Sequence, residues 1–129
     1  RVRGVSTTPV ASWDLFPTIA ALCSATPPTG LDGIDLSPVV RASGELPSRE
    51  FLYWEYPDGK GWQAVRIGNM KAIRRNAKAK PQGPIEVYDL AADPAETKDI
   101  SAARPEIVKR ALEVFSARTP SQIPEWNYD

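Results

Sequence analysis

The sequence has no histidine and a single cysteine, Cys23, among its 129 residues. One cysteine cannot form a disulfide within the chain, and without histidine it cannot complete a zinc site of the usual spacing. The lack of histidine also excludes a Ser-His or Cys-His nucleophilic pair. Because Cys23 ends an apolar run, we expect a small buried side chain there, with a reactive thiol as the alternative.

An excess of charge and a long apolar run are also missing. Sixteen basic residues balance sixteen acidic ones, so no overall field favours binding to nucleic acid or to an anionic membrane surface. No apolar run approaches the roughly 18 residues that a membrane span requires. The length suits one modest core and not two ordinary domains. Since the chain begins at Arg1 and its only methionine is Met70, we interpret it as a fragment or a processed piece.

Aromatic and aliphatic runs between turn residues predict a small sheet. The predicted strands cover residues 50–56, 62–67, 70–75 and 85–90. Turn sequences follow two of them, Pro57-Asp58-Gly59 after the first and Gly68-Asn69 after the second. Strands joined by such short turns favour antiparallel pairing with one solvated face.

The last predicted helix begins at Pro105, a residue that suits the first helical position. Five apolar residues then form one stripe at helical spacing: Ile107, Val108, Ala111, Leu112 and Phe115. Burial of this stripe favours packing of the helix on the sheet. The sequence therefore predicts an α+β fold, in which a C-terminal helix packs on a small four-stranded antiparallel sheet. Beyond the helix, Trp126 and Tyr128 favour a tail that crosses the surface as a strap.

Another helix is predicted at about 13–24, with Ser12 as its N-cap. Two apolar stripes run along it, the first with Leu15, Ile19 and Leu22 and the second with Phe16, Ala20 and Cys23. A helix that is apolar on both stripes is usually buried from several sides, and this chain has little material to cover it. We therefore assign residues 1–45 to the end of a larger domain that would cover this helix, and residues 46–129 to a smaller C-terminal subdomain.

Five blocks of sequence follow one another with regular spacing. They are V-A-S-W-D-L-F-P-T-I at 10–19, L-D-G-I-D-L-S-P at 31–38, L-Y-W-E at 52–55, A-V-R-I-G-N-M-K at 64–71, and E-V-Y-D-L at 86–90 with D-P-A-E behind it. In this order they resemble the carboxy-terminal part of sulfatases of the arylsulfatase type. One position departs from the family's pattern, because Met70 stands where a tryptophan usually precedes the strand lysine.

The resemblance implies a hydrolase of sulfate esters whose chemistry lies outside this chain. In the family the nucleophile is a formylglycine made from a Cys/Ser-x-Pro-x-Arg motif, and a calcium ion steadies the sulfate. Both belong to the large amino-terminal domain. Here Cys23 is followed by S-A-T, and the aspartates at 32 and 35 have a spacing that favours loop capping over metal binding. We therefore expect no catalytic residue, metal ligand or cofactor site in this chain.

The resemblance also implies that loops of the small sheet lie near the mouth of the active site. Candidate substrate contacts are Trp54 and Trp62, which would stack on a sugar or aryl ring. Glu55 and Arg66 would hold polar substituents of the substrate. Core packing of Trp54 and an ion pair between Glu55 and Arg66 are the structural alternatives. The basic run at 71–80 fits a solvated hairpin face or the attraction of an anion.

Two functions are compatible with these features. In the first, the chain is the carboxy-terminal part of a sulfuric ester hydrolase, which packs on its own catalytic domain, shapes the substrate pocket and is inactive alone. In the second, it is a stand-alone binding module for a sulfated glycan or a protein partner. The apolar helix favours the first, because a large exposed apolar patch indicates an absent partner. If the chain is expressed alone, residues 1 to about 45 should be poorly anchored or should pair with another copy through Leu15, Ile19 and Leu22. The compartment stays open, although bacterial sulfatases are often exported to the periplasm or the exterior.

Overall fold

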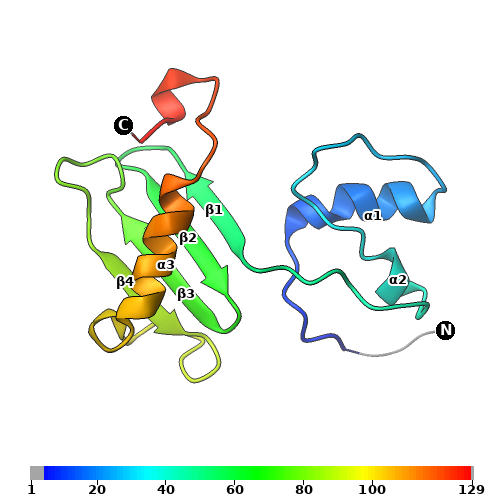
Figure 1. Ribbon diagram of the computed structural model, residues 1–129, viewed down its shortest axis with the longest axis horizontal. Coiled ribbons are helices and arrows are strands. Elements are labelled where there is room, and N and C mark those ends of the chain that lie inside the picture. Colours follow the sequence, from blue (N-terminus) through cyan, green and yellow to red (C-terminus); the bar gives the residue numbers. More distant parts are fainter. Residues whose placement is uncertain (1–4, 129) are drawn as a thin grey trace. The chain divides into compact units, whose positions relative to one another are not determined.

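The computed structural model describes residues 5–128, and Arg1, at which the chain starts, lies outside this range. The chain divides into two compact units, Arg1–Arg49 and Glu50–Asp129, and each is described by itself. Figure 1 shows helices α1 and α2 in the first unit and a sheet with helix α3 in the second. The predicted membership of residues 1–45 in a larger domain stays a prediction.

The second unit is built on an antiparallel sheet with the strand order β1-β2-β3-β4. Its strands are β1 (Leu52–Tyr56), β2 (Trp62–Ile67), β3 (Met70–Arg75) and β4 (Ile85–Asp89). The turn between β2 and β3 is the predicted Gly68-Asn69, and Gly68 adopts a φ of +57° there, which costs glycine little. Val65 of β2 pairs with Ala72 of β3, which pairs with Val87 of β4. The predicted four-stranded antiparallel sheet is confirmed.

Helix α3 (Pro105–Ser116) covers one face of this sheet (Figure 1) and closes the core. The buried cluster takes three residues from the strands and three from the helix: Val65, Ala72, Val87, Ala111, Val114 and Phe115. Leu112, which the apolar stripe predicts to be buried, is 43% exposed, and Val114 is buried instead. Ala111, Val114 and Phe115 share one helical face at spacings of three and four, whereas Leu112 lies at its edge. Two short 3-10 turns, η2 (Ser101–Ala103) and η3 (Pro124–Trp126), flank the helix along the chain.

The first unit is organised around the buried carboxylate of Asp14. Its elements are the 3-10 turn η1 (Ser12–Asp14), the helix α1 (Leu15–Leu22) and the short helix α2 (Ser37–Val40). The carboxylate accepts hydrogen bonds from the backbone N–H groups of Ala11 (2.8 Å) and Ile34 (3.0 Å). It also accepts two from the guanidinium of Arg49 (2.5 and 3.1 Å). Burial alone would raise the pKa of Asp14, but Arg49 and the two N–H groups outweigh it and hold the pKa below its usual value.

Helix α1 begins later than the sequence predicts. Ser12 lies inside the 3-10 turn and not at an N-cap, and the carboxylate of Asp14 takes the capping role by accepting the N–H of Ala11. Because the helix begins at Leu15, Pro17 falls in its first turn. The N–H groups of a first turn have no partner within the helix, so the proline removes no helical hydrogen bond.

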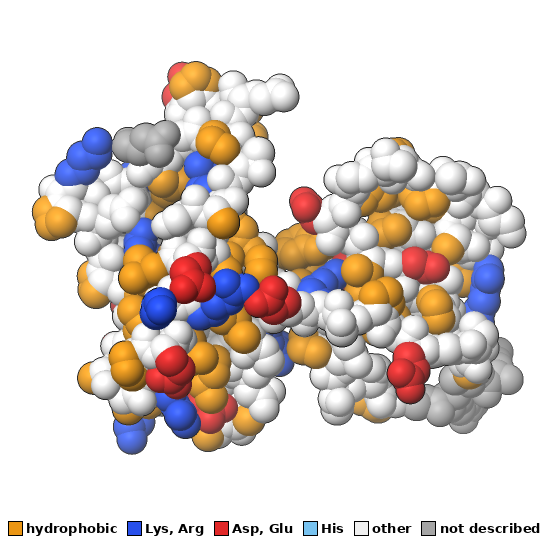
Figure 2. All heavy atoms as spheres, in the orientation of Figure 1, with side chains coloured by type: hydrophobic (Ala, Val, Ile, Leu, Met, Phe, Trp, Pro, Cys, Tyr) orange, Lys and Arg blue, Asp and Glu red, His pale blue; other side chains and the backbone are white. Residues whose placement is uncertain are grey.

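The apolar residues of α1 lie at the surface of the first unit. Four large ones are 40–57% exposed, and we call them the α1 face: Leu15, Phe16, Ile19 and Leu22. Cys23, which the apolar run predicts to be buried, is exposed as well. The buried residues of α1 are Pro17 and Thr18. Figure 2 shows hydrophobic side chains among the surface atoms of both units. Within residues 5–128 no helix is long and apolar enough to cross a membrane.

Candidate functional site

The sheet face opposite α3 carries an aromatic groove of about 560 Å³. Side chains alternate across a strand, so residues between those that pack on α3 point to this face. The groove is lined by Trp54, Glu55 and Tyr56 of β1, Trp62, Gln63, Ala64 and Arg66 of β2, Lys71 and Ile73 of β3, and Leu90 and Glu96 beyond them. In the register, Ala64 stands between Trp54 and Ile73, so the smallest of these side chains lies at the centre of the sheet face.

Both tryptophans of the groove reach solvent. Trp54 is 37% exposed and Trp62 is 47% exposed. Full core packing, the alternative interpretation of Trp54, does not fit this exposure. The guanidinium of Arg75 lies over the ring of Trp62, 5.4 Å from its centroid, which leaves the other side of that ring for a second contact.

Cationic side chains stand beside these rings. The ammonium of Lys71 pairs with the carboxylate of Glu96 (2.6 and 2.8 Å), so its charge is largely matched. The guanidinium of Arg66 donates its Nε–H to the backbone carbonyl of Gly68 (2.9 Å). All four sequence-predicted site residues therefore line one groove: Trp54, Glu55, Trp62 and Arg66. Aromatic rings beside a guanidinium suit a ring-shaped ligand with an anionic substituent.

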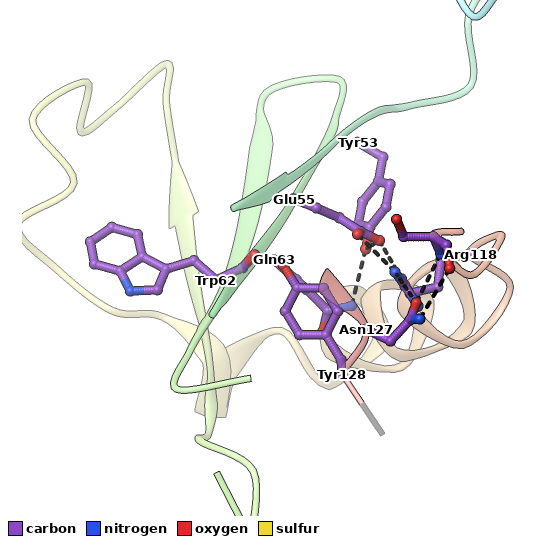
Figure 3. A network of polar contacts seen from close by, with 8 residues as sticks. Tyr53, Glu55, Trp62, Gln63, Arg118, Asn127 and Tyr128 are labelled. Atoms are coloured by element: carbon purple, nitrogen blue, oxygen red, sulfur yellow. Dashed lines mark hydrogen bonds and ion pairs between the residues drawn. The ribbon is translucent and has the colours of Figure 1, made fainter. Parts of the chain in front are cut away.

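The side chain of Glu55 points away from this groove. Figure 3 shows Glu55 and Trp62 on opposite sides of the sheet. The carboxylate of Glu55 accepts hydrogen bonds from Arg118, at 2.5 Å from Nε and 3.1 Å from Nη2, and from the hydroxyl of Tyr53 at 2.5 Å. The ion pair between Glu55 and Arg66, which was the alternative for these two residues, is therefore not formed.

The Glu55–Arg118 pair ties the C-terminal tail to the sheet (Figure 3). Its hydrogen bonds to Glu55 raise the pKa of Arg118, which also contacts the side-chain oxygen of Asn127 (3.3 Å). Tyr128 is buried and donates its hydroxyl proton to the backbone carbonyl of Trp62 (3.0 Å). Burial raises the pKa of Tyr128 to about 12. Tyr128 thus anchors the tail at the start of β2, whereas Trp126, the other residue on which the predicted strap depended, is exposed. No local signal indicated the ion pair between Glu55 and Arg118, which are 63 positions apart.

A second pocket, of about 230 Å³, lies on the α3 side of the sheet beside this tail. It is lined by Gln63, Arg74, Gln82, Phe115, Ser116, Arg118, Pro120 and Tyr128. The prediction of one solvated hairpin face for the basic run is wrong for Arg74, which is buried. Strand alternation is the reason, since Lys71 and Arg75 point to the groove face and Arg74 to the α3 face.

Within residues 5–128, no group of three or more His, Cys, Asp or Glu side chains could hold a metal ion. Asp35 accepts hydrogen bonds from the backbone N–H and the hydroxyl of Ser37 (2.7 and 2.8 Å), so it caps the start of α2. The loop-capping interpretation is confirmed for this residue.

Relatives of known name match this chain over most of its length. It is 32% identical to arylsulfatase A of Homo sapiens over 146 residues and 34% identical to arylsulfatase A of Bos taurus over 130 residues. Its homologues are sulfatases of the arylsulfatase type. These matches cover 93% and 85% of this chain but only 29% and 26% of the two enzymes, of which the chain corresponds to the carboxy-terminal part. No protein-family model matches the chain.

Solved sulfatase-like structures contain the same fold. The structure of the protein named Ps i-CgsB superposes with a TM-score of 0.69 at 25% identity, over 94% of this chain and 27% of that one. A protein solved in complex with its substrate D-glucosamine-2-N,6-O-disulfate superposes with a TM-score of 0.64 at 24% identity, over 80% of this chain and 22% of that one. The chain thus spans between a fifth and a third of the proteins it resembles.

Proposed function

We propose that this chain is the carboxy-terminal part of a sulfuric ester hydrolase, that it packs on the catalytic domain and shapes the substrate pocket, and that it is inactive alone. The α1 face carries the proposal. Four large apolar side chains of one short helix stand 40–57% exposed in this chain. Contiguous apolar surface of this kind marks a place where another part of a protein binds.

The occupant of the α1 face would be the catalytic domain of the same protein. The chain covers less than a third of each arylsulfatase A, so most of such an enzyme lies outside it. Burial of a large apolar side chain stabilises by roughly 1.5–3 kcal/mol when it is complete. Because the four residues are already partly covered, the gain at each would be about half of that. Even so, the sum would hold the first unit firmly against its partner.

The aromatic groove would form one wall of the substrate pocket. Trp54 and Trp62 would stack on a ring, and Arg66 would donate hydrogen bonds to sulfate oxygens. A sulfated carbohydrate is the favoured substrate class, and the substrate named for one structural relative is a disulfated glucosamine. A direct contact from Glu55 would require its ion pair with Arg118 to open, so we place its contribution in fixing the tail.

The reacting groups would come from the catalytic domain. The family resemblance implies a formylglycine nucleophile and a calcium ion there, and the residues described here supply neither. The role of this chain would therefore be to orient the substrate ring and to exclude water from one side of it. Its contribution would appear in the KM for large substrates more than in the chemical step.

The test begins with the gene upstream of the codon for Arg1. An in-frame Cys/Ser-x-Pro-x-Arg motif is expected there. The full-length protein should then hydrolyse an aryl sulfate or a sulfated sugar, and the 129-residue chain alone should not. In the full-length enzyme, Trp62→Ala should raise the KM for a sulfated sugar about tenfold. Trp126→Ala is the matched control, since Trp126 is exposed to a similar degree but lies outside the groove.

The alternative function is a stand-alone binding module for a sulfated glycan or a protein partner. The groove itself favours it, because Arg66 and two exposed tryptophans lie in a unit with its own closed core. A start codon close to Arg1 and no nucleophile motif upstream would support this function. Saturable binding of a sulfated glycan by the chain alone, lost in Trp62→Ala, would then be expected.

A further inference from the structure

The pocket on the α3 side of the sheet contains a buried cation without a carboxylate partner. Arg74 is only 8% exposed. Its Nη1 donates to the side-chain oxygen of Gln82 (2.6 Å), and its guanidinium lies 5.3 Å from the ring centroid of Phe115. Its Nε–H is buried and has no hydrogen-bond partner. Within residues 5–128, Arg74 forms no ion pair.

Arg118 lines the same pocket, and its guanidinium, unlike that of Arg74, is paired with a carboxylate. Its charge is compensated by Glu55, which contacts it at 2.5 and 3.1 Å. Arg74 has no such partner, although burial lowers its pKa and so works against its charge. A guanidinium nevertheless stays protonated in proteins. The pocket therefore holds one positive charge more than it holds negative charge.

A buried acceptor without a partner faces the same pocket. Gln63 stands directly opposite Arg74 in the sheet register, and its side-chain oxygen has no hydrogen-bond partner. Its Nε2 donates to the hydroxyl of Tyr53 (3.0 Å), which donates in turn to Glu55 (2.5 Å). This chain of donors fixes the orientation of the amide, since a rotated amide would turn an acceptor toward a hydroxyl whose proton is already used.

We propose that this pocket binds a small oxyanion that still carries a proton, with inorganic phosphate as its simplest example. The Nε–H of Arg74 donates to one oxygen of the anion, and the anion's own O–H donates to the oxygen of Gln63. Inorganic phosphate retains at least one O–H at neutral pH, because its third proton is lost only at strongly alkaline pH. Sulfate retains none and would set an anionic oxygen against the acceptor. A water molecule would satisfy the same two atoms but would leave the charge of Arg74 unmatched.

The proposal is tested by titrating the 129-residue chain with phosphate and with sulfate by calorimetry at constant ionic strength. Phosphate should bind saturably at one site, and sulfate should bind at least about tenfold more weakly. Arg74→Met should weaken phosphate binding about tenfold to a hundredfold. Arg75→Met is the matched control: Arg75 is the next residue on β3, but it points to the groove face and pairs with Glu86. It should bind phosphate like the unchanged chain.

A second variant keeps the proposal falsifiable if Arg74→Met fails to fold, which circular dichroism would detect. Gln63→Met removes the acceptor and should abolish the preference for phosphate over sulfate. The absence of phosphate binding by the unchanged chain, or an unchanged affinity in Arg74→Met, would overturn the proposal. Equal binding of sulfate would also overturn it and would point to a site for the sulfate that the proposed parent enzyme releases. No measurement here depends on hydrolysis, so the inference can fail without the proposed function failing.

Discussion

The two units of this chain bury opposite kinds of side chain. In Glu50–Asp129 the residues with no exposure are apolar, among them Val65, Val87 and Ala111. In Arg1–Arg49 the residue with no exposure is Asp14, and the other buried polar residues there are Thr18 and Ser37. Most of the large apolar side chains described in that unit are exposed, and Trp13, Ile34 and Leu36 are half-buried. One unit therefore has a core of its own, and the other has a polar scaffold that presents an apolar helix.

This difference changes what holds each unit together. The second is stabilised by apolar burial between α3 and the sheet, which is proportional to area and insensitive to pH. The first depends on a few directed contacts. The hydroxyl of Thr18 donates to the backbone carbonyl of Asp14 (2.6 Å) and accepts from the N–H of Leu36 (2.9 Å), in addition to the four contacts of the Asp14 carboxylate. Substitutions should therefore affect one unit at a time.

The largest effect is expected from Phe115→Ala in the second unit. Phe115 is buried in the α3 cluster and packs against the ring of Tyr53, 5.9 Å between centroids. Its truncation should lower the free energy of unfolding of that unit by about 3–5 kcal/mol. Leu112→Ala, on the exposed edge of the same helix, should cost less than about 1 kcal/mol. Hydrogen exchange resolved by peptide mass spectrometry would measure both, and an equal loss of protection in residues 11–40 would show that the units are not independent.

The next effect is expected from Asp14→Ala in the first unit. The substitution leaves Arg49 and the N–H groups of Ala11 and Ile34 without their acceptor. Removal of one partner of a buried ion pair should cost roughly 3 kcal/mol, confined to that unit. Asp32→Ala is the control, because Asp32 is exposed. The same exchange experiment applies, and unchanged protection of α1 in Asp14→Ala would refute the scaffold role of this carboxylate.

Ionisation of tyrosine at alkaline pH should destabilise only the second unit, since all four tyrosines lie after residue 50. Burial, with the neighbouring carboxylate of Glu55, raises the pKa of Tyr53 above 10.0 and that of Tyr128 to about 12. A pKa raised in the folded state gives stability that is complete below pH 10 and is lost as the pH rises through the folded value.

The loss should be on the order of 1 kcal/mol by pH 11 and should shrink in Tyr53→Phe. Tyr56→Phe, at an exposed tyrosine on the groove face, should not change it. Urea unfolding of the second unit at pH 8 and pH 11 would measure the difference. A pH dependence that survives in a variant with both Tyr53→Phe and Tyr128→Phe would assign it to other groups.

The sequence predicted the second unit well because its signals are local. Turn residues such as Gly68-Asn69 mark the strand ends, and Pro105 marks the start of α3. The four candidate site residues also line one groove, because they lie on the adjacent strands β1 and β2, and Trp54, Trp62 and Arg66 point to the same face. A pattern with a period of two or of three to four residues can be recognised without knowledge of distant contacts.

What the sequence could not predict depends on long-range pairing. An ion pair between Glu55 and Arg66 was one alternative for these residues, but strand alternation turns the carboxylate of Glu55 toward Arg118, 63 residues away. Arg74 was placed in a solvated run, although it points to the α3 face and its neighbour Arg75 points to the groove face. Cys23 was expected to be buried, and within this chain it is exposed. The α1 face was expected to need a cover that this chain has little material to supply, and it is exposed as well. Both exposures are expected if the covering surface belongs to another part of a longer protein.

The smallest effect on stability, and the sharpest test of the comparison, is expected from the double variant Leu15→Gln, Ile19→Gln. Both side chains are exposed, and glutamine is a good helix former, so unfolding of the first unit should change by no more than about 0.5 kcal/mol. The double variant should instead reduce self-association, because an exposed apolar face should pair with a second copy. Light scattering after size exclusion should find the unchanged chain associating at high concentration and the double variant monomeric. The control is Leu112→Gln, which removes an exposed leucine from α3 and should associate like the unchanged chain. If this control became monomeric and the double variant did not, the surface in need of a partner would lie on the sheet unit and not on α1.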